Sequence, residues 1–191
     1  MADPAYIVDG VLTDGEAWVG IATASPSAAN VQFVSTDDGQ VGDWSQYMDL
    51  VVVMYARSSY AATSDDMYFR YNNDTGSNYM YQRLRGDGSA ATAYSGEYSF
   101  AYTGKCPAAT ATANIFGAAV ATLFDINSGK YKSAISNAAS DLDGSGYADM
   151  RATTWKSQAP IIEIDIGPAS GAFAAGSMFS LFGILPRMVT A

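Results

Sequence analysis

The chain has 191 residues, of which 49% are hydrophobic and 13% aromatic, and its formal net charge is −9. It has no histidine and a single cysteine, which excludes histidine-based catalytic triads, histidine-containing zinc sites and an internal disulfide. A nucleic-acid binder needs a basic stripe to neutralise phosphates, and the basic residues here are scattered singly, so nucleic acid is not expected as a partner.

The length suits one large β-sandwich or two small domains, and no linker, repeat or composition break divides the chain. We predict an irregular N-terminal arm over residues 1–16 and one β-sandwich domain over residues 17–191. The arm is acidic, contains Pro4, and has the composition of a segment that is ordered by a neighbour. The first residues lack the basic start and apolar core of a secretion signal, so we expect the protein to be made in a cytoplasm.

The first two strands are predicted over residues 18–24 and 31–34, with a turn at Pro26 between them. A polar loop over residues 36–43 follows. It leads into residues 47–88, the stretch around which the chain is organised.

Residues 47–88 have the pattern of three successive strands. Residues 50–55 form a continuous apolar run rich in β-branched side chains, which is typical of a strand covered on both faces. Residues 67–72 and 79–84 alternate apolar and polar side chains, the period-2 pattern of a half-buried strand. A turn cluster over residues 72–78, rich in Asn, Asp and Gly, joins these two strands.

The second half of the chain continues in strands and turns. Residues 89–95 are small and polar and are predicted to form a loop, followed by a strand over residues 98–102. Residues 111–126 are apolar, and their β-branched and aromatic side chains around Gly117 favour a bulged strand. Further strands are predicted over residues 130–136, 147–156, 161–166 and 179–185. About ten short strands separated by turns indicate an all-β, antiparallel, jelly-roll-like sandwich.

The tract between Asp165 and Arg187 carries no charge and has the length of a membrane span. Its glycines and prolines argue against a helix. We therefore predict a turn-rich loop followed by a buried last strand, and no contact with a membrane.

One loop resembles a calcium-binding loop in spacing. Its oxygen-bearing side chains stand at positions 1, 3, 5 and 9: Asp141, Asp143, Ser145 and Asp149. Ala152 replaces the bidentate Glu that position 12 requires. We favour a polar hairpin connection over an ion site, and predict no metal and no cofactor.

Carboxylate pairs and the cysteine are the remaining candidates for chemistry, and the pairs are Asp37-Asp38, Asp65-Asp66 and Glu163/Asp165. A glycosidase needs two carboxylates that face each other across a cleft. Glu163 and Asp165 lie two residues apart on one strand face, but this face is more simply the solvated side of the strand. Cys106 has no histidine partner to lower its pKa and is interpreted as structural. The Arg85-Gly86-Asp87 tripeptide is interpreted as a tight turn. No catalytic residue is predicted.

Tyrosines are abundant, and a set of six is a candidate sugar-binding surface: Tyr55, Tyr60, Tyr68, Tyr71, Tyr79 and Tyr81. Aromatic rings stack on sugars, but they also pack sheets and fill subunit contacts. We favour packing and subunit contact for this set.

Two segments are the most specific in the chain: the strand–NDTGSNY–strand–GDGS element over residues 73–89, and the ending FAAGSMFSLFG over residues 173–183. Together with the stretches YMDLVVVMYARSS, ANIFGAAVATLFDI and YKSAIS, their order from about residue 20 to residue 184 resembles a family of β-sandwich proteins in the virions of tailed bacteriophages. The arm before Trp18 lies outside the resemblance.

The resemblance implies a non-enzymatic structural protein. Its expected role is that of a capsid decoration (cement) protein on the virion surface, binding and stabilising the shell of the major capsid protein as a homo-oligomer, either a trimer or a dimer. One alternative is a tail or fibre component that binds a host-surface glycan through tyrosine-rich faces. Another is a carbohydrate-active enzyme that uses Glu163 and Asp165.

Overall fold

The computed structural model describes residues 7–8, 11–12, 18–26 and 29–186 of the chain. Within them, an eight-stranded sheet has the spatial order β3 (Trp18–Ala24), β14 (Met178–Ile184), β5 (Asp49–Ala56), β10 (Gly117–Phe124), β11 (Lys132–Asp141), β12 (Gly146–Trp155), β7 (Tyr79–Gly86) and β8 (Ala91–Tyr98). A four-stranded sheet has the order β4 (Val31–Val34), β13 (Glu163–Pro168), β6 (Ser64–Tyr71) and β9 (Ala101–Pro107). One 3-10 turn, η1 (Trp44–Gln46), precedes β5.

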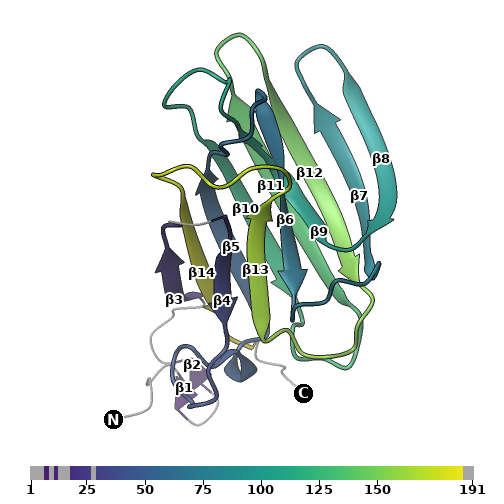
Figure 1. The fold of residues 1–191 in the computed structure, drawn as a ribbon. Helices are drawn as coiled ribbons and strands as arrows, with labels where there is room; N and C mark the ends of the chain where they lie inside the picture. Colours follow the sequence, from purple (N-terminus) through teal and green to yellow (C-terminus); the bar gives the residue numbers. More distant parts are fainter. Residues whose placement is uncertain (1–6, 9–10, 13–17, 27–28, 187–191) are drawn as a thin grey trace.

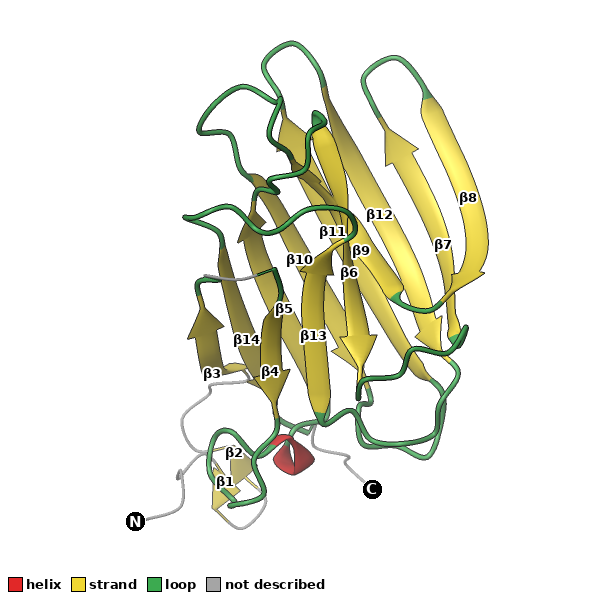
Figure 2. Ribbon diagram, in the orientation of Figure 1, coloured by secondary structure: helices red, strands yellow, loops and turns green. Residues whose placement is uncertain are grey.

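The two sheets face each other as a sandwich, and every strand pair within them is antiparallel (Figures 1 and 2). The chain passes from one sheet to the other between β3 and β4, β4 and β5, β5 and β6, β6 and β7, β8 and β9, β9 and β10, β12 and β13, and β13 and β14. This repeated crossing gives the jelly-roll-like winding, and the predicted all-β sandwich is confirmed.

The apolar core lies between the sheets, because alternate residues of each strand point inward. Its largest fully buried side chains include Leu50, Met54, Met67, Phe69 and Phe179, which come from both sheets. Burial of such side chains is the main favourable term in folding, at about 1.5–3 kcal/mol each.

The continuous apolar run over residues 50–55 is covered on its inner face but only in part on the other. Val51 is fully buried, whereas Val53 and Tyr55 are 37% and 48% exposed. The expectation of a strand covered on both faces is therefore wrong for the second half of β5. The apolar side chains there belong to an exposed surface of the large sheet.

The turn cluster predicted over residues 72–78 joins β6 to β7. Asn72 and Asn73 have φ values of 50° and 55°, in the left-handed region that asparagine tolerates. The Asp74 carboxylate accepts a hydrogen bond of 2.7 Å from the indole N–H of Trp155 on β12. The turn is thereby tied to the core, which fixes where β7 begins.

Two predicted segments after β7 are wrong. The loop expected over residues 89–95 is mostly strand β8, and the strand expected over residues 98–102 is interrupted by a turn, with β9 beginning at Ala101. Strand β8 is the edge of the large sheet, and its first five residues are exposed on both faces. It therefore shows none of the alternation by which a half-buried strand is recognised.

The bulged strand predicted over residues 111–126 is also wrong in two respects: its first six residues are not in a strand, and it has no bulge at Gly117. Gly117 is the first residue of β10, whose register with both neighbouring strands is continuous. A Cβ at this position would overlap Ser140 Oγ and lie 2.8 Å from Pro107 Cδ, so the glycine permits a close approach rather than a bulge. The strand expected over residues 130–136 is longer, because β11 runs on to Asp141.

Of the arm predicted over residues 1–16, the structure describes only β1 (Ile7–Val8) and β2 (Val11–Leu12), which pair with each other in antiparallel register. For these four residues the expectation of irregular backbone is wrong; the remainder of that prediction, with Pro4, lies outside the described residues. In the uncharged tract after Asp165, residues 166–168 complete β13, and the predicted loop and last strand follow; the expectation of a buried last strand is wrong, because β14 is half-buried. Among the described residues, no helix is long and apolar enough to cross a membrane.

Strand β9 lies directly on β11, and Gly104 permits this contact, because a Cβ there would overlap the Cβ of Ala138. We expect Gly104→Ala to lower the free energy of unfolding by about 1–3 kcal/mol in urea denaturation. The control is Gly86→Ala, a strand glycine whose added Cβ meets nothing within 4 Å. The double variant Gly104→Ala/Ala138→Gly should recover part of the loss; equal stabilities for all the variants would contradict this packing.

Candidate functional site

The large sheet has a broad exposed face, turned away from the small sheet, which we call the outer face. Strand alternation assigns it these exposed side chains: Met80, Gln82 and Leu84 on β7, Ala148, Met150 and Ala152 on β12, Ile135, Asn137 and Ala139 on β11, Ala118 and Val120 on β10, Val53 and Tyr55 on β5, and Met178 on β14. Neighbouring strands lie ~4.8 Å apart and rise ~3.4 Å per residue, so these six strands present about 500 Å². This area is at the upper end of the range for the largest apolar patch on a monomeric protein, and such patches are often functional.

Cross-strand register arranges the outer face in rows. One row contains Val53, Val120, Asn137, Met150 and Leu84. The adjacent row contains Tyr55, Ala118, Ala139, Ala148 and Gly86. Because the second row is mainly alanine and glycine, it is lower than the first, and a shallow groove of about 560 Å³ runs between them.

The outer face carries no charged side chain, although the chain as a whole has a net charge of −9. The acidic side chains nearest to it in the sheet, Glu97 and Asp141, lie at its margins on β8 and at the end of β11. Its large apolar members are well exposed, with Leu84 at 52% and Met150 at 50%. A surface of this kind is suited to contact with another uncharged protein surface.

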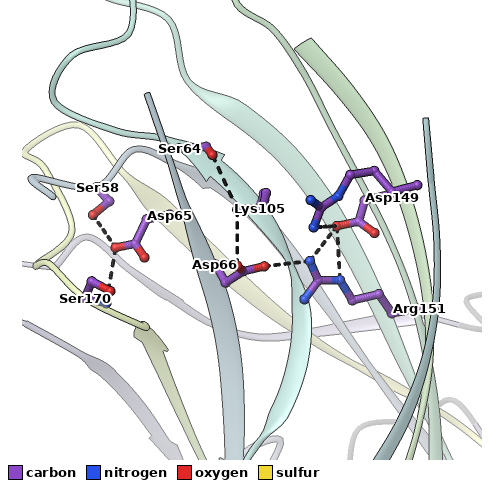
Figure 3. A network of polar contacts seen from close by, with 9 residues as sticks. Ser58, Ser64, Asp65, Asp66, Lys105, Asp149, Arg151 and Ser170 are labelled. Atoms are coloured by element: carbon purple, nitrogen blue, oxygen red, sulfur yellow. Dashed lines mark hydrogen bonds and ion pairs between the residues drawn. The ribbon is translucent and has the colours of Figure 1, made fainter. Parts of the chain in front are cut away.

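Beside β9, the edge strand of the small sheet, an ionic network joins the two sheets (Figure 3). Arg151, fully buried on β12, donates from Nη2 to Asp149 Oδ2 at 2.5 Å and to Asp66 Oδ1 at 2.7 Å. Lys105 of β9 lies 3.2 Å from Asp66 Oδ2, and Arg85 of β7 lies 3.6 Å from Asp149 Oδ2. The network thus joins β6, β7, β9 and β12.

The network shifts the pKa values of its members. Burial alone raises the pKa of the Asp66 carboxyl, but the charges and hydrogen bonds of Arg151 and Lys105 outweigh burial, and the net result is a lowered pKa. Burial opposes ionisation of Arg151 as well, and the two carboxylates more than compensate, so its pKa is raised. Asp66 and Arg151 are therefore ionised at neutral pH and stabilise each other's charges.

The acidic pair Asp65-Asp66 divides between two roles, because successive residues of β6 point to opposite faces. The Asp65 carboxylate is buried and accepts a hydrogen bond of 2.7 Å from Ser58 Oγ and one of 3.1 Å from the backbone N–H of Gly171. It therefore fixes the loop between β13 and β14, whereas Asp66 belongs to the ionic network.

The structure separates the members of the calcium-like loop. The loop is the β11–β12 hairpin connection, with Asp143 at φ 63° and Gly144 at φ 95°. Asp149 points into the interior and is bound to Arg151, away from Asp141. In the described part of the chain, no three His, Cys, Asp or Glu side chains are grouped to hold a metal ion.

The other candidates for chemistry are engaged in local contacts. Gln32 Nε2 donates to Glu163 Oε1 at 2.6 Å and to Asp165 Oδ1 at 3.1 Å, so the two carboxylates do share the solvated face of β13, as predicted. Burial, with the charges of nearby acidic residues, raises the pKa of the Cys106 thiol to about 12 and keeps it protonated. The tight turn predicted for Arg85-Gly86-Asp87 is wrong for its first two residues, which end β7; the turn begins at Asp87, whose carboxylate accepts from the backbone N–H groups of residues 89 and 90.

The six tyrosines selected from the sequence do not form one surface. Tyr71 and Tyr79 pack in the core around Trp155, and Tyr55 stacks on Phe116 with ring centroids 5.0 Å apart. Tyr68 packs on Phe100, and Tyr60 is exposed in a loop. Only Tyr81 belongs to a tyrosine-lined hollow, and its partners there are Tyr94, Tyr98 and Tyr102. Sequence reasoning missed this cluster because Tyr94 lies in the segment assigned to a loop.

No model of a known protein family matches this chain, and a search of curated proteins finds no match either. The resemblance to virion proteins has no counterpart in these comparisons, so the functional role enters as a proposal.

Removing the buried cation should be costly. We expect Arg151→Met to lower the free energy of unfolding by about 3–5 kcal/mol at pH 7, because Asp149 remains buried without its main partner. Urea denaturation measures the change. In the control Lys156→Met, the residue left without its ion-pair partner is Glu97, which is more exposed than Asp149. The loss of free energy of unfolding should therefore stay below about 1 kcal/mol.

The ionic network also predicts a dependence of stability on pH. Because the folded-state pKa of Asp66 is lowered from its usual value of 3.8, its contribution is complete above pH 3.8 and is lost as the pH falls through the folded-state value. The stability difference between the wild type and Asp66→Asn should therefore narrow as the pH falls below 3.8. Asp37→Asn, at an exposed loop position outside the network, should show no such convergence. A difference for Asp66→Asn that stayed constant down to low pH would contradict the assignment.

Proposed function

We propose that this chain is a non-enzymatic virion structural protein, a capsid decoration protein that binds the major capsid protein shell of a tailed bacteriophage. The observation that carries the proposal is the uncharged outer face of the large sheet. A decoration protein needs a broad, flat surface that adheres to a regular shell, and it must stay soluble before it attaches. The segments that resemble virion proteins supply the setting.

The charge distribution suits this role. A net charge of −9 keeps free copies apart in solution, because like charges repel. The outer face lacks those charges, so contact through it brings no acidic side chain of its rows into an interface. Attachment is then driven mainly by burial of apolar side chains such as Leu84, Met150 and Val120.

The size of the outer face implies that single copies attach weakly. A standard stable interface buries about 800 Å² on each partner, and the outer face offers about 500 Å². An oligomer that engages several capsid subunits at once gains affinity without new contacts, since later contacts form at high effective concentration. We therefore propose a homo-oligomer, a dimer or a trimer, as the attached form.

The test is the copy number of this chain in purified particles, measured by quantitative mass spectrometry against the major capsid protein. A copy number comparable with that of the capsid protein is expected. A copy number comparable with that of tail proteins would favour the alternative, a tail or fibre component. Absence from particles would refute both.

Charge placed on the outer face should prevent attachment. We expect Val120→Lys/Met150→Lys to fold as the wild type does, because both side chains are exposed, but to lose most binding to particles stripped of this protein. The readout is retention on particles after sedimentation. The matched control is Tyr131→Lys/Ile162→Lys, which alters two exposed apolar residues outside the outer face. Equal retention of both double variants would contradict docking through this face.

A further inference from the structure

The large sheet extends beyond the small one on the side of β7 and β8 (Figure 1). Strand β9 is the edge of the small sheet, so the inner face of β8 has none of the described strands of that sheet opposite it. A cleft of about 330 Å³ opens there, and its lining is confined to six side chains: Asp66, Tyr81, Arg83, Tyr94, Tyr98 and Tyr102. Its volume is at the small end of the range for ligand pockets.

Four tyrosine rings form the walls of the cleft. The ring of Tyr81 is central, with centroids of Tyr94, Tyr98 and Tyr102 at 5.8, 5.5 and 5.5 Å. Tyr94 is 47% exposed, which leaves part of its ring free to contact a ligand. The hydroxyls of Tyr94 and Tyr98 share a hydrogen bond of 3.1 Å, which holds these two side chains together at the rim.

Polar groups converge on the same space. The Asp66 carboxylate supplies acceptors and is held in place by Arg151. Arg83 supplies donors, and its Nε is buried with no hydrogen-bond partner among the described residues. The hydroxyls of Tyr81, Tyr98 and Tyr102 remain neutral at physiological pH, because burial raises the pKa of Tyr81 and Tyr102, and the hydrogen bond to Tyr94 together with burial raises that of Tyr98 to about 12. The cleft thus combines apolar faces with donors and acceptors.

We propose that this cleft binds a neutral sugar residue of a glycan. A pyranose ring has an apolar C–H face that stacks on an aromatic ring, here Tyr94, and hydroxyls that both donate and accept hydrogen bonds. Asp66 accepts from such hydroxyls and Arg83 donates to them. Apolar walls with a few convergent polar groups are the general form of a small-molecule site.

The charges in the cleft select against ionic ligands. The guanidinium of Arg83 lies 5.8 Å from the ring centroid of Tyr94, and that of Arg151 lies 5.5 Å from that of Tyr102. These cations already interact with the rings and repel a cationic ligand such as a quaternary ammonium group. An anionic ligand is opposed by Asp66 and by the net charge of −9. A neutral ligand avoids both penalties.

The cleft and the outer face lie on opposite sides of β7. Tyr81 and Arg83 point to the cleft, while Met80, Gln82 and Leu84 belong to the outer face. A copy bound through the outer face therefore leaves the cleft open. Sugar binding is independent of the proposed attachment to a capsid and is tested on the free protein.

The experiment uses the full chain, fluorescently labelled, on an array of neutral and acidic oligosaccharides, followed by calorimetric titration of the strongest neutral oligosaccharide and of choline chloride. Tyr94→Ala and Arg83→Met should each weaken binding of the neutral oligosaccharide by about tenfold or more. The control Tyr131→Ala, an exposed tyrosine in a loop remote from β7 and β8 in sequence, should bind as the wild type does. Circular dichroism and thermal unfolding establish that each variant is folded.

Binding of a neutral oligosaccharide that is weakened by both cleft variants and kept by the control supports the proposal. It is overturned if no neutral oligosaccharide binds at millimolar concentration, if only acidic oligosaccharides or choline bind, or if both cleft variants bind as the wild type does. Particle copy number should be the same for Tyr94→Ala and the wild type, so failure of sugar binding is distinguishable from failure of the capsid proposal.

Discussion

A four-stranded sheet cannot cover an eight-stranded one, and this mismatch governs how the two halves of the sandwich are built. Where strands from both sheets oppose each other fully, the interior is apolar and is filled by side chains such as Phe69, Leu50 and Phe179. Toward β12 and β7, the small sheet ends at its edge strand β9. On this side the apolar core still includes Tyr79 and Trp155, and an ion-pair network around Arg151 is added to it.

The ionic network contributes to the contact between the two sheets on the side of β7 and β12. Arg151 reaches from β12 to Asp66 on β6, and Asp66 also pairs with Lys105 on β9, so the ion pairs join this edge of the small sheet to the large sheet. Gly104 and Ala138 bring the backbones of β9 and β11 close together. Beyond this contact the sheets diverge, and the tyrosine cleft occupies the space that β9 leaves uncovered. The cleft therefore depends on the difference in strand number between the two sheets as much as on the residues that line it.

The sequence predicted the half-buried strands well and the exposed ones poorly. Strands such as β6, with buried Met67 and Phe69 alternating with polar residues, were predicted because burial on one face produces period-2 alternation. Strand β8 lies at an edge and has no such pattern. The last part of β11 has small residues at buried and exposed positions alike, with Ala138 and Ser140 buried and Ala139 exposed, so the two faces differ too little in hydrophobicity to be separated.

The candidate surfaces were less predictable than the fold. A continuous apolar strand is compatible with burial on both faces or with an exposed apolar face, and only the three-dimensional arrangement shows that Val53 and Tyr55 belong to the second case. Likewise, the tyrosines of the cleft come from β7, β8 and β9, and their meeting depends on which strand lies at the edge of each sheet. No local pattern contains that information.

The side chains of β7 alternate between two surfaces, and this alternation constrains how the sequence can evolve. Because the side-chain period of a strand is two, substitutions at Tyr81 or Arg83 alter one surface and leave Met80 and Leu84 in place on the other. A one-residue insertion or deletion within the strand would exchange the two sets and damage both surfaces together. The two recognition surfaces are thus free to diversify by point mutation, whereas the length of β7, set by the Asp74 turn before it, is constrained by both.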